Sequence, residues 1–234
     1  MTTTFITGAN KSLGYETARR LVEAGHDVLL GARDPERGRA AAEALGARFV
    51  QIDVTDDASV AAAAAAAADV AAREGGIDVL INNAGVFGTH SPADQITAAD
   101  ASAVFEVNVV GIVRVTHAFL PLLRKSANPV IVNVSSGMGS FAATHDAERV
   151  ESRNLAPLYT ASKAAVTMLT TQYAKSWPEM KVNAADPGYT ATDFNGHSGP
   201  QTVTEGTDAI VELATLGTDG PTGTFRDRHG EVAW

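Results

Sequence analysis

Short apolar segments alternate along the chain with longer stretches of helical character, and this alternation limits the fold more than any other feature. The runs VLLGA, VLINN and VIVNV are apolar at nearly every position, which is typical of strands buried on both faces of a parallel sheet. Right-handed crossovers between such strands give a doubly wound, Rossmann-like α/β sheet. The predicted strands are Thr3–Thr7, Val28–Ala32, Arg48–Asp53, Val79–Asn82, Val130–Val134, Val182–Ala185 and, with a weaker signal, Gly223–Arg226. The predicted helices are Leu13–Glu23, Pro35–Leu45, Ala58–Glu74, Ala98–Leu123, Pro157–Trp177 and Thr204–Leu216.

The 234 residues contain no linker, repeat or shift in composition, so we expect a single Rossmann-like domain over residues 1–234. A net charge of −9 without any Lys/Arg-rich run argues against nucleic acid as a partner. The absence of cysteine excludes thiolate metal sites, and the six histidines show no metal-ligand spacing, so no metal is expected. We find no signal-peptide pattern and no convincing membrane span, and we expect a cytoplasmic protein.

The first predicted strand runs into the sequence TGANKSLG, which opens a helix. Gly8 and Gly14 enclose a tight loop where backbone amides and a helix N-terminus can face a pyrophosphate. The standard dinucleotide pattern GxGxxG is not present, and taken alone such a loop is also compatible with plain turn chemistry. The candidate phosphate-binding residues are Gly8, Asn10, Lys11, Ser12, Leu13 and Gly14.

This loop resembles the TGxxxGxG motif of classical short-chain dehydrogenases/reductases. Thr7, Gly8 and Gly14 match that motif, whereas Ser12 stands in place of its middle glycine. Further motifs match in the correct order along residues 3–192, and a lengthened segment before the YTASK motif is similar to that of carbonyl-reductase-like members. The resemblance implies a nicotinamide-dependent oxidoreductase with a small carbonyl or alcohol substrate.

The end of the second predicted strand bears on the choice of cofactor. An NAD-preferring site usually places a carboxylate there, but this chain has Ala32 followed by Arg33, whose guanidinium can clamp a 2′-phosphate. Lys11 resembles the second basic contact of the family, and Asp34 counts against this assignment. The cofactor is therefore expected to be NADP(H). The resemblance assigns further cofactor contacts to Asp53, Val54, Asn83, Ala84, Gly85, Tyr159, Lys163, Pro187, Gly188, Thr190 and Thr192.

Tyr159 and Lys163 lie four residues apart on a predicted helix and so share one face. An ammonium group there can stabilise a phenolate, which predicts a lowered tyrosine pKa with help from a cofactor cation. By itself this spacing is common on amphipathic helices. The resemblance adds Ser136 as the hydroxyl that polarises the substrate oxygen and Asn108 as a support of the proton relay, with Tyr159 as general acid and base.

Two segments depart from the family pattern or remain open. The stretch GSFAATHDAERVESRN makes the Ser136–Tyr159 interval longer than is typical; it either shapes the substrate mouth or blocks the helix pairing of tetrameric members, so a homo-oligomer is only one option. The segment Tyr189–Thr202 is a candidate lid. The candidate apolar pocket residues, each of which could equally be core, are Phe141, Leu155, Tyr189 and Phe194.

Two other functions compete with the reductase. A non-catalytic NADP-sensing module would also need the cofactor loop, but it need not keep the serine, tyrosine, lysine and asparagine together. An epimerase or dehydratase of the related extended type is disfavoured by the glycine spacing and by the short C-terminal part.

Overall fold

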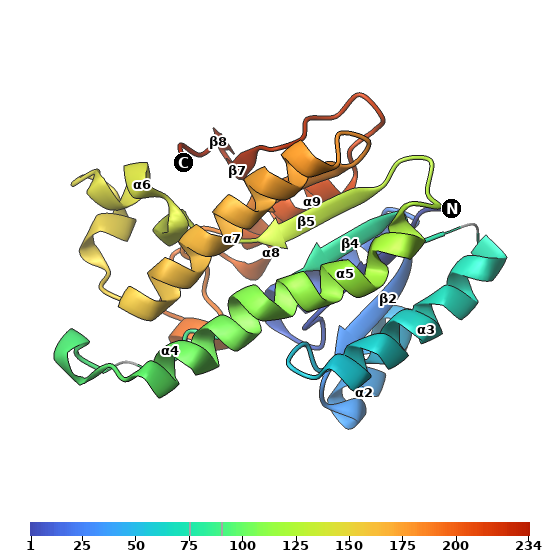
Figure 1. Cartoon of the computed structure of the whole chain (residues 1–234), viewed down its shortest axis with the longest axis horizontal. Coiled ribbons are helices and arrows are strands. Elements are labelled where there is room, and N and C mark those ends of the chain that lie inside the picture. The colour runs from blue at the N-terminus through green and yellow to red at the C-terminus, as the bar shows by residue number, and fades with distance from the viewer. Residues whose placement is uncertain (75, 90) are drawn as a thin grey trace.

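The computed structural model describes residues 1–74, 76–89 and 91–234. Within these residues, one sheet of eight strands forms the centre of the molecule, in the order β3-β2-β1-β4-β5-β6-β7-β8 (Figure 1). All neighbouring strands pair in parallel except β7 and β8, so the predicted doubly wound α/β sheet is confirmed. The strands are β1 (Thr3–Ile6), β2 (Asp27–Ala32), β3 (Arg48–Gln51), β4 (Val79–Asn82), β5 (Val130–Val134), β6 (Lys181–Ala185), β7 (Phe225–Asp227) and β8 (Gly230–Glu231).

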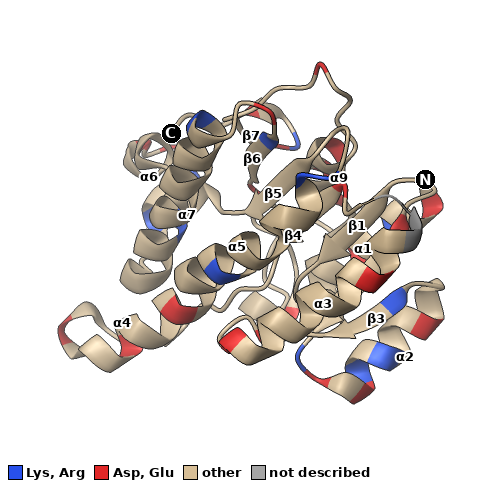
Figure 2. Ribbon diagram, turned by 45° about the vertical axis from the view of Figure 1, so that its right-hand side comes forward, with Lys and Arg blue, Asp and Glu red and all other residues tan. Residues whose placement is uncertain are grey.

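The burial of β1, β4 and β5 accounts for the apolar runs from which these strands were predicted. Every residue of β1, β4 and β5 is buried, and none of these strands carries a charged residue. Figure 2 shows that the charged residues lie mostly on helices and loops around this apolar centre. Strand order changes direction between β1 and β4, which places a crevice at the carboxyl ends of these two strands.

Three helices cover each face of the sheet. On one face, α3 (Asp57–Glu74), α5 (Gly111–Leu123) and α7 (Pro157–Ser176) pack in a hydrophobic layer that includes the rings of Phe5 and Phe119, which are tilted at 46° with centroids 4.4 Å apart. On the other face lie α1 (Ser12–Glu23), α2 (Pro35–Leu45) and α9 (Asp208–Ala214). The two hydrophobic layers hold the strands rigidly and so fix the positions of the loops at their ends.

The predicted helix over residues 98–123 is continuous but not uniform. It consists of α4 (Ala98–Phe105), a π-helical turn η2 (Glu106–Val110) and α5. Among the described residues, one stretch, Ala98–Leu123, could cross a membrane by its length and its mean hydropathy of 1.5, but Val115 and Phe119 pack it into the core against the sheet. The π turn contains Asn108, and its extra residue rotates the helix at this position.

Elsewhere the elements differ in detail from the sequence prediction. The predicted helix Thr204–Leu216 is split at Thr207 into α8 (Val203–Gly206) and α9. The lengthened segment after Ser136, for which no element was predicted, contains regular turns and one short helix. These elements are η3 (Gly137–Gly139), α6 (Phe141–His145) and η4 (Val150–Arg153), and two further 3-10 turns are η1 (Ala93–Gln95) and η5 (Asp193–Asn195).

Candidate active site

The carboxyl ends of the parallel strands surround a cleft of about 1310 Å³. This volume exceeds the few hundred to about 1,000 Å³ of a typical small-molecule site, and it therefore has room for a dinucleotide and a second molecule. Every site residue predicted from the sequence lines this cleft, except Asn108, which is absent from the described lining. Residues from Gly8 to Thr192 are thus brought together from six different strand ends.

The first wall of the cleft is the glycine loop after β1, which is fastened to the loop after β4. The Thr7 hydroxyl accepts hydrogen bonds from the backbone N–H groups of Asn83 and Ala84, both at 3.0 Å. In return, Asn83 Nδ2 donates to the carbonyls of Thr7 and Gly8 at 2.9 and 3.1 Å. A Cβ on Gly14 would lie 2.5 Å from Asn83 Nδ2, so only glycine fits between the two loops.

The N-terminus of α1 points its backbone into the cleft. No side chain in the described part of the chain caps this helix at Lys11, and Ser12 and Leu13 of its first turn line the cleft. Uncapped N–H groups at the positive end of a helix dipole attract anions. The residues present therefore fit a pyrophosphate. The loop includes Gly8, which has a φ of +65° and where an added Cβ would lie 3.0 Å from Ala84 Cα, so there is little room for a side chain.

Ser12, the departure from the glycine motif, adopts a left-handed conformation with φ of +49°. It is one of two residues other than glycine with positive φ in the described part of the chain. The loop therefore keeps the backbone geometry that a glycine would take most easily, and Ser12 holds it under strain.

The two basic residues predicted to hold a 2′-phosphate have different surroundings. Arg33 is exposed at the end of β2, lines the cleft, and makes no ion pair among the described residues. Asp34, which counted against NADP, instead caps α2 by accepting the N–H groups of Glu36 and Arg37. Lys11 forms an exposed ion pair of 3.1 Å with Asp193, a partner that the sequence did not predict.

Tyr159, Lys163 and Ser136 meet at the other end of the cleft. Lys163 Nζ lies 5.7 Å from the centroid of the Tyr159 ring and donates to the Val134 carbonyl at 2.7 Å. Ser136 accepts from the N–H of Met138, and its hydroxyl also hydrogen-bonds Tyr159. The sequence predicted a lowered tyrosine pKa, but burial raises the pKa of Tyr159 above its ordinary value of 10.0, against the opposing effect of the Ser136 bond.

Burial acts on Lys163 as well, and lowers the pKa of its ammonium group to about 8, although the charge of Asp186 opposes this shift. Within the protein alone, desolvation thus disfavours the charged forms of both the phenol and the amine. An acidic phenol therefore requires additional positive charge in the cleft.

Asn108 is buried and hydrogen-bonds residues of the loop after β4 and of α7. Its Oδ1 accepts from the Val86 N–H at 2.8 Å, and its Nδ2 donates to the Val86 carbonyl at 2.9 Å and to Ser162 Oγ at 3.0 Å. A Cβ on Gly85 would lie 3.4 Å from Asn108 Oδ1 and 3.7 Å from Lys163 Nζ. Asn108 therefore ties the loop after β4 to α7, next to the lysine.

Sequence reasoning missed two buried carboxylates. Asp186 accepts from the N–H groups of Gly137 and Gly188, and burial raises its pKa to about 6, an effect increased by nearby Glu151. Glu151 lies in the lengthened segment and pairs with Arg149 at 2.9 Å. Both carboxylates lie within 3 Å of where a Gly137 Cβ would be. The signal for Asp186 was its place directly after β6, at the same sheet edge as the other motifs.

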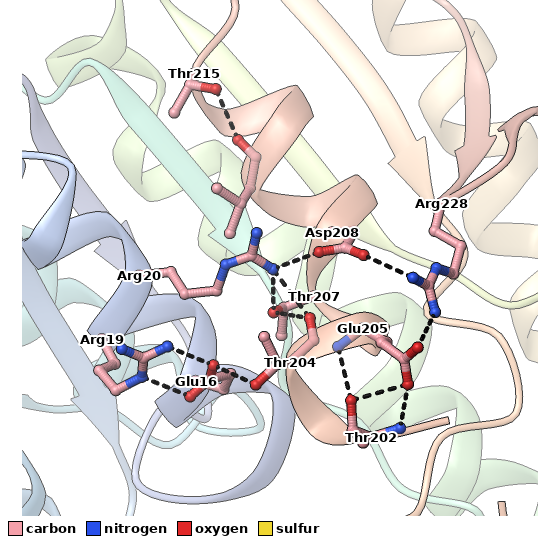
Figure 3. Close-up of polar contacts among 11 residues, drawn as sticks. Glu16, Arg19, Arg20, Thr202, Thr204, Glu205, Thr207, Asp208, Thr215 and Arg228 are labelled. Carbon is pink, nitrogen blue, oxygen red and sulfur yellow. Dashed lines mark hydrogen bonds and ion pairs between the residues drawn. The ribbon is translucent and has the colours of Figure 1, made fainter. Parts of the chain in front are cut away.

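The segment Tyr189–Thr202, predicted as a lid, is fastened at both ends. At its start, Thr190 is buried and donates to the Pro187 carbonyl at 2.8 Å. Beyond its end, Arg20 of α1 bonds the Thr204 carbonyl, Thr207 and Asp208 in the network of Figure 3, while Arg228 pairs with Glu205. Its middle part carries Phe194 over the cleft. The middle part is in turn tied to the glycine loop by the ion pair between Lys11 and Asp193, so the segment is held at three places.

The predicted apolar residues divide between two places. Leu155, Tyr189 and Phe194 line the cleft, whereas Phe141 is 71% exposed and is not among its described lining residues. In the described part of the chain, no group of three or more His, Cys, Asp or Glu side chains could hold a metal. His90, one of the scattered histidines, lies outside the described residues.

Known proteins share this arrangement. A family model described as short chain dehydrogenase matches residues 2–202. The (+)-neomenthol dehydrogenase of Capsicum annuum is 30% identical over 94% of this chain and 93% of its own. Short-chain dehydrogenase anuI of Penicillium roqueforti is 36% identical over 91% and 88%. The solved structure of NADPH-bound carbonyl reductase from chicken fatty liver superposes with a TM-score of 0.87 at 29% identity, covering 99% of this chain and 98% of that one.

Replacing Ser12 by glycine is expected to stabilise the fold by about 1 kcal/mol, because the left-handed conformation costs a residue with a Cβ roughly that amount. Ser12→Ala keeps the Cβ and is the matched control, for which no gain is expected. Urea unfolding of the three proteins measures the difference. Equal stabilities of the glycine and alanine variants would contradict the strain.

The raised pKa of Asp186 predicts that its contribution to stability falls as the pH rises from about 4 to about 6. In that window the folded protein holds a proton that the unfolded chain, with its ordinary value of 3.8, has already lost. Asp186→Asn removes this titration. The free energy of unfolding of the variant, relative to wild type, should therefore rise by up to about 3 kcal/mol between about pH 4 and pH 7.

The matched control for this effect is Asp193→Asn, because the exposed carboxyl of Asp193 has a lowered pKa beside Lys11. Its contribution runs in the opposite direction, since stability from that carboxylate is lost as the pH falls. Denaturation curves over this pH range check both signs. A pH-independent difference between wild type and Asp186→Asn would show that Asp186 titrates normally.

Proposed function

Because the chain belongs to the short-chain dehydrogenase family, we propose that it is an NADP(H)-dependent oxidoreductase that interconverts a carbonyl compound and an alcohol, with Tyr159 as general acid and base. One observation carries this proposal. A single cleft holds an uncapped helix N-terminus and Arg33 at one end, and Tyr159, Ser136 and Lys163 at the other.

In the reductive direction, the Tyr159 hydroxyl gives its proton to the carbonyl oxygen as that oxygen gains negative charge. With a substrate bound, the Ser136 hydroxyl, which lies beside Tyr159, donates its single proton to the same oxygen and stabilises the developing charge. The nicotinamide cofactor, when bound, supplies the hydride that reaches the carbonyl carbon. Alcohol oxidation reverses the direction of the proton.

The electrostatics of the site favour the protonated phenol. Burial raises the pKa of Tyr159, so within the protein alone the phenol stays protonated but is a weaker acid. Lys163, with a pKa of about 8, is mostly protonated near neutral pH and lies on the same side of α7, so its charge limits the penalty of forming a phenolate.

Three features support NADP(H) over NAD(H). Ala32 leaves the end of β2 without a carboxylate, and Asp34 is engaged in capping α2. Arg33 is exposed toward the cleft, where its guanidinium can pair with a 2′-phosphate. The carbonyl reductase with which this fold superposes at 29% identity is itself an NADPH complex.

Tyr159→Phe is expected to lower the rate of carbonyl-dependent NADPH oxidation by about 100-fold or more, because the proton donor is lost. A panel of aldehydes, ketones and quinones, followed by the loss of NADPH absorbance, measures this. Tyr189→Phe, which removes another cleft hydroxyl, should keep most of the activity. If the wild type binds the cofactor but reduces none of these compounds, the non-catalytic NADP-sensing module is favoured instead.

Arg33→Ala is expected to raise the KM for NADPH by about tenfold or more and to leave the KM for NADH nearly unchanged, because only the charge-assisted bonds to the 2′-phosphate are lost. Arg37→Ala is the matched control, since Arg37 is equally exposed but pairs with Asp34 and is not among the described lining residues. An unchanged ratio of the two KM values in Arg33→Ala would refute the assignment to NADP(H) and leave the reaction class intact.

A further inference from the structure

Exposed apolar side chains gather around the tyrosine end of the cleft. Isolated exposed apolar residues are normal on a protein surface, but a group of them around one cleft indicates a binding surface. Leu155 is 93% exposed, the most of any large apolar residue described. The members of this group, which we term the apolar rim, are Val86, Val150, Leu155, Tyr189 and Phe194.

Three aromatic rings form the floor inside the apolar rim. The Phe87 ring stacks on Tyr159 with centroids 5.1 Å apart, and Phe194 lies 5.5 Å from Tyr159 and edge-on to Phe87 at 5.8 Å. Phe194 is also 40% exposed, so part of its ring remains open to a ligand. A molecule that presents its carbonyl to Tyr159 therefore places its remaining atoms against aromatic and aliphatic carbon.

The charged groups around this end of the cleft are already paired or buried. Glu151 pairs with Arg149, Asp193 pairs with Lys11, and Asp186 is buried. Among the described lining residues, the cations other than Lys163 are Lys11 and Arg33, which belong to the glycine loop and the end of β2. Lys163 itself is buried and donates to the Val134 carbonyl. A substrate carboxylate would thus lose water without gaining a cationic partner.

We propose that the substrate is a neutral, apolar carbonyl compound, with a ring or branched hydrocarbon body, and that the apolar rim excludes anionic carbonyl compounds. This inference rests on the proposed function, because it assumes that Tyr159 marks the reacting carbonyl. It adds what the catalytic residues do not specify: the surface that meets the rest of the substrate. The rim comes from three separate segments, which follow β4, β5 and β6.

Three ketones of nearly equal size test this proposal. 4-Isopropylcyclohexanone is neutral and apolar, 4-oxocyclohexanecarboxamide is neutral and polar, and 4-oxocyclohexanecarboxylate is anionic. The expected order of kcat/KM follows that sequence, with the isopropyl compound about 100-fold above the carboxylate, the size of effect that one group in a pocket produces. An equal or higher value for the carboxylate would overturn the proposal.

Two variants locate the effect in the apolar rim. Leu155→Lys places a cation at an exposed position and should raise kcat/KM for the carboxylate about fivefold while lowering it for the isopropyl ketone. Met168→Lys, on the outer side of α7 and 59% exposed, adds the same charge away from the cleft lining and should change neither value. Equal responses of the two variants would show that general charge, and not the rim, sets the preference.

A binding measurement separates this proposal from the proposed function. Saturation-transfer NMR without cofactor ranks the three ketones by binding alone, and Phe194→Ala should weaken the signal of the isopropyl compound most. If the binding order holds but none of the ketones is reduced, the proposed function fails and the apolar rim stands. If reduction occurs with the reverse order, the inference fails and the function stands. If Leu155→Lys instead changes the oligomeric state of the protein in solution and leaves the selectivity among the three ketones unchanged, the rim is a protein contact and the proposal is overturned.

Discussion

The site depends on one set of hydrogen bonds at the point where the strand order reverses. Thr7 at the end of β1 and Asn83 after β4 bond each other through both backbone and side chain, so the two loops become one wall of the cleft. Gly14 must lack a side chain because Asn83 Nδ2 occupies the place of its Cβ. The same wall turns the first N–H groups of α1 into the cleft, where they can meet an anion. Without this contact, the helix end and the strand ends would not face a common ligand.

Desolvation is the second constraint, and it acts on three buried titratable groups of the cleft, Tyr159, Lys163 and Asp186. Burial raises the pKa values of Tyr159 and Asp186 and lowers that of Lys163, so each group is pushed toward its neutral form. The negative charge of Asp186 opposes this tendency at Lys163, because it raises the pKa of the ammonium group. At the Tyr159 hydroxyl, desolvation outweighs the opposing bond from Ser136, which explains why the protein alone favours the phenol over the phenolate.

The sequence predicted the sheet and most of the cleft because those signals are local. Apolar runs mark buried strands, and motifs directly after them must meet at one edge of a parallel sheet. What could not be predicted depends on contacts between distant residues. Lys11 carries no local sign that Asp193, 182 residues later, competes for its charge. Glu151 sits in a polar stretch that reads as surface, and only the fold shows that Arg149 and the small Gly137 allow its burial. The break at Thr207 likewise lies where a distant residue makes contact, since Arg20 donates to the Thr207 hydroxyl.

The cleft therefore combines two kinds of construction with different freedom to vary. Around the glycine loop, the backbone of several strand ends forms much of the wall, and a substitution at Gly8, Gly14 or Asn108 would disturb more than one of them. Around the tyrosine end, part of the surface consists of exposed side chains on segments that lie outside the sheet. Phe194 packs against Tyr159, but Leu155 is 93% exposed, so a change at Leu155 alters what the cleft presents without moving Tyr159 or Lys163. Single substitutions at this surface can therefore change substrate preference while the positions of Tyr159 and Lys163 stay fixed. For this reason the proposed substrate class rests on the apolar rim and not on the catalytic residues.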